Sequence, residues 1–298
     1  LDYSVEGEDE EAVFDFTCEE IIRTIERAAG DKRIPITVFK VTGIGRFGLL
    51  EKLDAKKALT IEELAEFEKV KERCEKICRT AYEKNVPIMV DAEETWIQDT
   101  IDELAIDMMR LFNKERIIVY NTYQLYRHDK LADMKADHLI AKASGFILGV
   151  KMVRGADMEK ERKRAEEMGY PSPIQPNKKS SDRDYDASLH YCMEHISDIA
   201  FVCGTHNEES CRVLAQLLDE YQVPHNHPHV YFAQLLGMSD NLSFNLSDAG
   251  YNVTKYVPYG PVKAVMPYLF RRAQENTSIA GQTSRELGLI IKEKQRRK

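Results

Sequence analysis

Short β-rich apolar runs alternate with helical stretches along almost the whole chain, and this alternation limits the folds that the chain can adopt. The runs are Ile34–Thr42, Val86–Asp91, Arg116–Asn121, Phe146–Val153, Ile199–Gly204, His229–Phe232, a weak one at Leu242–Asn245, and Asn252–Val257. Several are apolar on both faces, as strands of a buried parallel sheet must be. About eight βαβ units in under 300 residues fit a closed (β/α)8 barrel.

The segments between these runs are predicted to form amphipathic or charged helices, such as Ile61–Lys84 and Glu94–Phe112. The chain contains no Gly/Ser-rich linker, so we predict a single domain over residues 1–298 with an N-terminal helical segment before the barrel. The Pro- and Ser-rich stretch Gly169–Asp184 is predicted to be a surface loop between two helices.

Composition excludes several classes of protein. A net charge of −8, with no basic stripe, argues against nucleic acid as a partner. The chain has no apolar run of the ~18–20 residues that span a bilayer, and its acidic first residues resemble neither a signal nor a transit peptide. The six cysteines form no CxxC pair, so we expect them to be reduced, as in a cytosolic or matrix-like compartment.

Polar residues stand at the ends of the predicted strands. They are Lys40, Asp91, Asn121, Lys151, Arg154, Thr205, His206, Asn207 and Tyr256. In a parallel barrel these ends share one rim, where such enzymes place their active sites. Each residue alone could be a helix cap or a solvated rim charge. Together, these cations and amide donors suit a phosphorylated cofactor and a carboxylate substrate.

Two adjacent arginines, Arg271 and Arg272, interrupt an apolar helical run near the C-terminus. Neighbours on a helix point about 100° apart, so one guanidinium faces the apolar side and needs an anionic partner. Glu275 can pair with Arg271, which leaves the other arginine for a substrate carboxylate. Alternatively, both arginines extend to the helix edge and remain solvated.

Two other motifs have less specific interpretations. GIGRFG at Gly43–Gly48 matches a dinucleotide-binding turn and leaves a nicotinamide-dependent dehydrogenase as an alternative. The run HNHPH places His225, His227 and His229 at alternate positions, where a metal could bind. Pro228 and the missing carboxylate partners favour a surface turn, so we predict no metal.

With these residues in view, the chain resembles the monofunctional proline dehydrogenases from Leu1 to the C-terminus. The motifs that carry the resemblance are VDAEET, NTYQLY, VKMVRGA, THN, VYFAQLLGM, GYNVTKYVPYGP and YLFRRAQEN, in this order. The resemblance implies a distorted (β/α)8, TIM-like barrel that holds FAD, with the final helix over the barrel mouth. It also makes GIGRFG a turn at a strand end, because this family binds FAD without a Rossmann fold.

The implied reaction oxidises L-proline to Δ1-pyrroline-5-carboxylate by hydride transfer to FAD, the first step of proline catabolism, with electrons passed to a quinone. The resemblance assigns the proline site to Lys40, Asp91, Lys151, Leu236 or its neighbour Leu235, Tyr256, Arg271 and Arg272. It assigns FAD contacts to Asn121, Lys151, Arg154, Gly155, Ala156, Thr205 and His206. It also implies that Glu275, in the cofactor-binding set, positions one of the paired arginines.

One residue departs from the family pattern: Asp157 stands where relatives have an aromatic residue. An added carboxylate near the rim leaves a second alternative, a flavin-binding barrel with impaired catalysis. The resemblance implies a cytoplasmic enzyme with peripheral membrane contact in a bacterium, or an enzyme on the matrix side of the mitochondrial inner membrane in a eukaryote.

Overall fold

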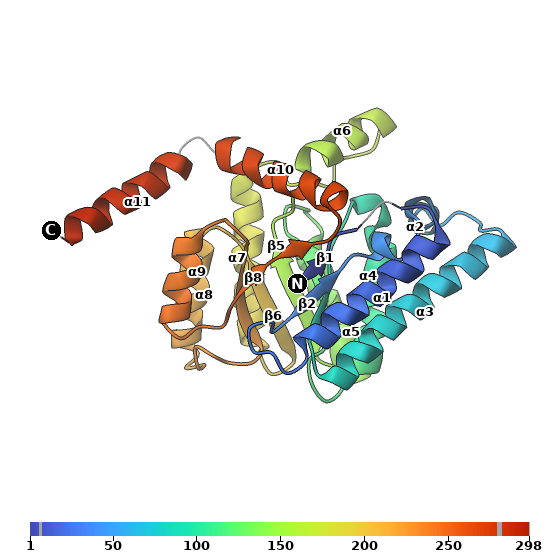
Figure 1. The fold of residues 1–298 in the computed structure, drawn as a ribbon, viewed down its shortest axis with the longest axis horizontal. Helices are drawn as coiled ribbons and strands as arrows, with labels where there is room; N and C mark the ends of the chain where they lie inside the picture. Colours follow the sequence, from blue (N-terminus) through green and yellow to red (C-terminus); the bar gives the residue numbers. More distant parts are fainter. Residues whose placement is uncertain (6–7, 279–281, 298) are drawn as a thin grey trace.

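The computed structural model describes residues 1–5, 8–278 and 282–297 (Figure 1). Its strands are β1 Asp2–Tyr3, β2 Thr37–Phe39, β3 Ile88–Val90, β4 Val119–Gln124, β5 Leu148–Val153, β6 Ile199–Gly204, β7 Val230–Leu235, β8 Val253–Tyr256 and β9 Pro258–Tyr259. Within the described residues these strands form one parallel sheet in the order β8-β7-β6-β5-β4-β3-β2-β1-β9. The predicted barrel architecture is therefore confirmed.

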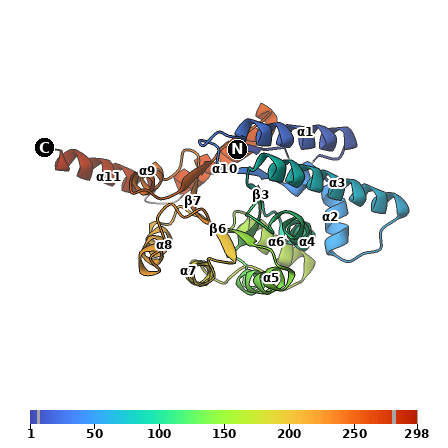
Figure 2. The same ribbon diagram turned by 90° about the horizontal axis from the view of Figure 1, so that it is seen from below.

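The helices follow the strands in sequence and surround them (Figure 2). They are α1 Glu11–Ala28, α2 Phe47–Asp54, α3 Ile61–Lys84, α4 Thr95–Phe112, α5 Lys130–Ser144, α6 Met158–Met168, α7 Lys178–Glu194, α8 Glu208–Glu220, α9 Asp240–Asp248, α10 Val262–Ser278 and α11 Gln282–Arg296. A short 3-10 helix, Val41–Gly43, follows β2. Among the described helices, none is both long and apolar enough to cross a bilayer.

The barrel closes through the first residues of the chain. β1 pairs with β2 on one side and with β9 on the other, and Asp2 N–H donates to the Val257 carbonyl at 3.1 Å. β8 and β9 are separated only by Val257, so this extended segment joins β7 to β1 and completes the wall. The sequence predicted a helical segment here, and the strand before α1 was missed.

The weak run Leu242–Asn245 was predicted to be a strand and is instead part of helix α9. Leu242 and Leu246 both pack on the core, and residues four apart lie on one helical face. The loop prediction at Gly169–Asp184 is right only up to Asn177. Asn177 accepts a hydrogen bond from Ser180 N–H at 2.9 Å and so starts α7 at Lys178.

The barrel interior and the helix-packed outer layer form separate apolar clusters. Inside the barrel lie Ile36, Val38, Met89, Tyr120, Ala200 and Val202, while the larger cluster fills the space between strands and helices. Both faces of the strands are therefore buried, which explains the continuous apolar runs in the sequence. In β4 the alternation places Tyr120, Thr122 and Gln124 on the inner face.

The GIGRFG segment follows the carboxyl end of β2 and packs against the N-terminal residues and α3. A Cβ at Gly43 would lie 2.7 Å from the Val5 carbonyl oxygen, and one at Gly45 would lie 2.6 Å from a Val70 methyl. These close contacts account for two of the glycines without a bound dinucleotide. The segment ends in the short helix α2.

Helix α10, which carries the paired arginines, lies across the carboxyl ends of the strands (Figure 1). It is followed by α11, which extends away from the barrel. The helix over the mouth is thus the penultimate one of the described chain. All six cysteines are buried, unpaired thiols, as the sequence predicts.

Gly149 provides a test of the close strand packing. A Cβ there would lie 2.1 Å from the Val119 carbonyl oxygen and 2.9 Å from Tyr120 Cα, both backbone atoms of β4. We expect Gly149→Ala to lower the free energy of unfolding by about 2–3 kcal/mol, measured by urea denaturation. Gly48→Ala is the control, because the only atom near its added Cβ would be Arg46 Nη1 at 3.4 Å and a helical alanine is neutral or stabilising. Equal stability of the two variants would contradict this packing.

Candidate active site

A cavity of about 890 Å³ opens at the carboxyl ends of the strands, beneath α10. It brings together most of the predicted site residues: Lys40, Asp91, Lys151, Arg154, Gly155, Ala156, Thr205, His206, Tyr256 and Arg272. These residues come from different strand ends and from α10, so only the closed barrel places them on one surface.

The centre of the cavity contains a linked set of charges. Lys151 Nζ forms a short ion pair with Asp91 Oδ1 and lies 5.5 Å from the centroid of the Tyr256 ring. Tyr256 Oη donates toward Asp91 Oδ2 at 3.3 Å. Both members of the ion pair have nearly buried side chains. The ammonium, the carboxylate and the phenol are therefore held in a fixed arrangement on the cavity wall.

Asp2 belongs to this arrangement and was missed from the sequence. Its side chain is only 1% exposed, and its Oδ2 accepts short hydrogen bonds from Tyr256 Oη and Ser4 Oγ. The alternation of Leu1, Tyr3 and Val5 is a strand signal that could have identified it. Such a short alternation was overlooked beside the acidic stretch that follows it.

Two carboxylates thus share one tyrosine hydroxyl. Burial and the neighbouring Asp91 raise the pKa of Asp2, while Lys40 opposes this shift. Burial, followed by Asp2 and Asp91, raises the pKa of Tyr256 well above its usual range. The phenol is therefore protonated at neutral pH and serves as the hydrogen-bond donor between the two carboxyl groups.

Arg154 is fixed by three different acceptors. Its Nε donates to Asp182 at 2.7 Å, its Nη1 to Thr205 Oγ1 at 3.0 Å and its Nη2 to Ser210 Oγ at 2.9 Å. The guanidinium also lies 4.2 Å from the centroid of the Tyr185 ring. This network attaches β5, β6, α7 and α8 to one cation on the cavity rim.

The turn after Arg154 requires a glycine. Gly155 has φ +121°, and a Cβ there would lie 2.5 Å from the Tyr126 ring. Both the backbone conformation and the ring exclude a larger residue. The turn therefore presents bare backbone to the cavity, where a ligand can approach closely.

Helix α10 contributes to the cavity through Tyr268 and Arg272. The Tyr268 ring stacks on Tyr256 with centroids 5.9 Å apart, and the Arg272 guanidinium lies 5.0 Å from the Tyr268 centroid. Arg272 therefore faces the barrel rather than the helix edge. The side chains of Arg271 and Glu275 lie outside the described part of the structure.

Two predicted residues lie away from the cavity. Asn121 is fully buried on the outer face of β4 and donates to Asp102 at 2.8 Å, while Gln124, three residues later, lines the cavity. Leu236 is 52% exposed, and its neighbour Leu235 lines the cavity instead. Side chains of a strand alternate between its two faces, so Asn121 points outward and Gln124 points into the barrel. A sequence motif alone does not specify which face a residue occupies.

Asp157 lines the cavity and occupies the N-cap position of α6. Its side chain makes no capping hydrogen bond, so capping does not account for the carboxylate.

The histidines of HNHPH have separate contacts: His225 bonds to Asp219 and stacks on Tyr251, and His229 bonds to the Ile196 carbonyl. The described residues contain no cluster suited to a metal ion.

Comparison with known proteins places these residues in a wider context. The family model for proline dehydrogenase matches residues 1–285. The chain is 38% identical to human mitochondrial proline dehydrogenase 1 over 270 residues, which is 90% of this chain and 45% of that protein. It is 33% identical over 297 residues to the carbapenem antibiotics biosynthesis protein CarD of Pectobacterium carotovorum, covering all of this chain and 77% of that protein.

Among solved structures, proline utilization A from Bdellovibrio bacteriovorus superposes with a TM-score of 0.82 at 23% identity. The match covers 94% of this chain and 30% of that protein, so the likeness concerns the fold of one part of it. The chain likewise spans about 40–45% of the length of the human and Caenorhabditis elegans relatives.

His206 gives the site a pH-dependent contribution to stability. Burial, with Lys255 and Arg272 nearby, lowers its pKa to about 4. The unfolded chain therefore takes up the proton first, and stability is lost as pH falls from about 6.5 toward 4. We expect His206→Gln to flatten the free energy of unfolding across this range in urea titrations.

His225→Gln is the control with the opposite sign. Asp219 raises the pKa of His225, so its contribution is present at low pH and is lost as pH rises. A His206→Gln variant with the same acid sensitivity as the parent would contradict the burial of a neutral imidazole.

Proposed function

The chain belongs to the proline dehydrogenase family, and we propose that it oxidises L-proline to Δ1-pyrroline-5-carboxylate with bound FAD. The single observation that carries this proposal is the cavity in which Lys151, Asp91 and Tyr256 meet beneath Arg272. The cavity combines cations, which can bind a carboxylate, with an aromatic face, on which a small ring can pack.

The substrate carboxylate would bind the cations at the mouth. Lys40 and Arg272 line the cavity, and Arg271 belongs to the same helix as Arg272. A guanidinium can hold a carboxylate through two parallel hydrogen bonds, and a lysine adds a point charge. These contacts would fix the ring in one orientation and so supply the positioning that the reaction needs.

Tyr256 would form the wall on which the proline ring packs. Its hydroxyl is held by Asp2 and Asp91, and its ring is stacked on Tyr268. The phenol therefore cannot turn away when substrate enters. An extra hydroxyl on the substrate ring would meet this fixed aromatic surface, so we propose a preference for proline over hydroxylated proline.

The residues on the other side of the cavity fit a flavin. A volume of about 890 Å³ lies at the upper end of the range for cofactor sites. Gly155 and Ala156 offer open backbone, while Gln124, Lys151, Thr205 and His206 supply polar groups. When bound, FAD supplies the two-electron acceptor for the hydride from the ring carbon next to nitrogen.

Proton transfers accompany the oxidation. The substrate ammonium must first lose one proton, because hydride transfer uses the nitrogen lone pair to form the C=N bond. The resulting iminium then loses its N–H proton to give the imine, and both protons can pass to solvent. Lys151 is a cation beside Asp91 and would stabilise negative charge that develops on the reduced cofactor. Asp157 introduces the opposite charge at the rim and would weaken this effect.

We propose a quinone as the final electron acceptor and peripheral contact with a membrane, as the resemblance implies. Relatives named as mitochondrial support a mitochondrial location in a eukaryotic source, and the matrix side of the inner membrane is our proposal from the resemblance. In a bacterial source the proposed location is the cytoplasm. A nicotinamide-dependent dehydrogenase has little support, since two of the three GIGRFG glycines, Gly43 and Gly45, pack against Val5 and Val70.

The visible spectrum of the purified protein tests the proposal. We expect a yellow protein whose flavin absorbance bleaches on anaerobic addition of L-proline and is not bleached by D-proline or trans-4-hydroxy-L-proline to the same extent. Acid precipitation is expected to release FAD, because the proposal includes no covalent link. A colourless protein that binds no added FAD would refute the cofactor, and a yellow protein unaffected by proline would indicate the impaired barrel.

Asp2 provides the sharper mutational test. We expect Asp2→Ala to lower kcat/KM for L-proline about tenfold, equivalent to about 1.4 kcal/mol, because Tyr256 loses one of its two acceptors. Ser4→Ala is the matched control, since Ser4 bonds to the same carboxylate and its removal leaves the bond between Asp2 and Tyr256 in place. Flavin content confirms that both variants fold. Equal losses in the two variants would mean that Asp2 acts only through local structure.

A further inference from the structure

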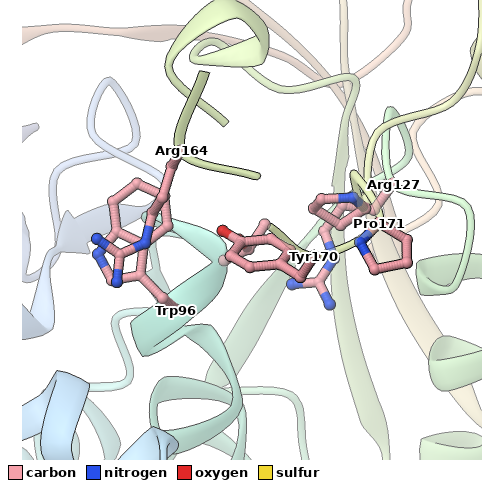
Figure 3. Close-up of a pocket in the computed structure, with 7 residues that line it drawn as sticks. Trp96, Arg127, Arg164, Tyr170 and Pro171 are labelled. Carbon is pink, nitrogen blue, oxygen red and sulfur yellow. The ribbon is translucent and has the colours of Figure 1, made fainter. Parts of the chain in front are cut away.

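A second pocket, of about 280 Å³, lies apart from the candidate active site (Figure 3). Its lining residues are Thr95, Trp96, Arg127, Arg164, Tyr170, Pro171 and Pro173, and none of them lines the large cavity. They come from the start of α4, the residues after β4, helix α6 and the loop before α7. Nothing in the proposed reaction uses this pocket.

Two guanidinium groups line it, and each has a hydrogen-bond donor left over. Arg127 is 6% exposed and binds Asp129 through Nε at 3.0 Å and Nη2 at 2.7 Å. Arg164 pairs with Glu51 through Nη2. Within the described part of the chain, Arg127 Nη1 and Arg164 Nε are buried without a hydrogen-bond partner. Unsatisfied buried donors of this kind are uncommon and call for an acceptor.

The loop that forms one wall is held firmly in place. Arg127 and Ile174 form an antiparallel bridge, His128 N–H donates to the Pro173 carbonyl at 3.1 Å, and Gln175 N–H donates to the Tyr126 carbonyl at 2.7 Å. This backbone pairing attaches the Pro-rich loop to the residues after β4. The pocket is therefore a built feature rather than a gap beside a loose loop.

The remaining surface is aromatic and apolar. The Arg164 guanidinium lies 4.2 Å from the centroid of the Trp96 ring, and Tyr170 and Pro171 face the same space (Figure 3). Asp129 and Glu51 already balance the two arginine charges, so the two guanidinium groups bring little net positive charge to the pocket. This balance suits one weakly hydrated anionic group attached to an apolar body better than a multiply charged phosphate.

We propose that this pocket binds a small monocarboxylate with a compact apolar body. The carboxylate would bind the Arg127 and Arg164 guanidinium groups, whose unpartnered Nη1 and Nε are covered in this structure and would turn toward the ligand when it binds. The apolar part would lie against Trp96 and Tyr170. The pocket volume restricts the ligand to a small molecule.

Bound ligand would also strengthen the contact between α6 and α4. Glu161 of α6 already accepts hydrogen bonds from the backbone N–H and the hydroxyl of Thr95 at the start of α4. Arg164, one turn further along α6, would be linked to the same helix start through the ligand. Because α6 follows the Arg154–Asp157 turn, this site could stabilise the wall of the large cavity without entering it.

Fluorescence gives a direct test, because Trp96 is the only tryptophan of the chain. The probe is cyclohexanecarboxylate, which is transparent where tryptophan is excited, titrated into the purified holoenzyme. We expect a saturable change in Trp96 emission, with binding at least tenfold weaker for the neutral analogue cyclohexanemethanol and for inorganic phosphate. Equal binding of the neutral analogue would indicate an apolar pocket only, and tighter binding of phosphate would overturn the proposed ligand class.

Substitutions then assign the response to the two donors. We expect Arg164→Met, which keeps an unbranched stem beside Trp96, to weaken binding of the probe at least tenfold. Lys163→Met is the matched control on the same helix, since its side chain is exposed and pairs with Glu167. Arg127→Met tests the second donor, with the melting temperature checked because Arg127 is buried. Probe affinity unchanged in Arg164→Met, or no emission change in the parent, would refute the proposal; both readouts are independent of proline oxidation.

Discussion

The arrangement of the candidate active site depends on the backbone hydrogen bonds that place β1 between β2 and β9. A parallel barrel leaves no edge strand only when its last gap is filled, and here a two-residue strand fills it. The same pairing brings Asp2 to the hydroxyl of Tyr256. The pairing of β1 that closes the sheet therefore also assembles the charged network.

The second constraint is the sharing of a single phenol by two carboxylates. Asp2 and Asp91 would repel each other if both were ionised and unpaired, and burial increases that cost. The Tyr256 hydroxyl and the Lys151 ammonium offset it. The buried hydrogen bonds and the ion pair restrict the motion of Tyr256, which is the property that a site for positioning a small ring requires.

Much of the barrel could be predicted from alternation of apolar runs and helices, because both faces of its strands are buried. The failures have local causes. β1 is too short to show a clear period, and α9 was mistaken for a strand because it contains few residues and few apolar ones. Gln124 lines the cavity where Asn121 was predicted to, and Leu235, the stated alternative to Leu236, lines it as well. The face of a strand to which a side chain points follows from register, which sequence motifs do not give. The contact between Asp2 and Tyr256 and the pocket around Trp96 join residues distant in sequence, and no local pattern specifies such contacts.

The separation of Asp2 and Tyr256, 254 residues apart in the chain, has a consequence for how the protein folds. Contacts between distant residues require the closure of long loops and form slowly. While the protein is being synthesised, β1 has no partner on its β9 side until nearly the whole chain has emerged. The early strands and helices can pack before then, but the ring of strands cannot be complete. Binding competence is therefore acquired at the end of folding, and a nascent or truncated chain without β8 and β9 would expose an open sheet edge to other chains.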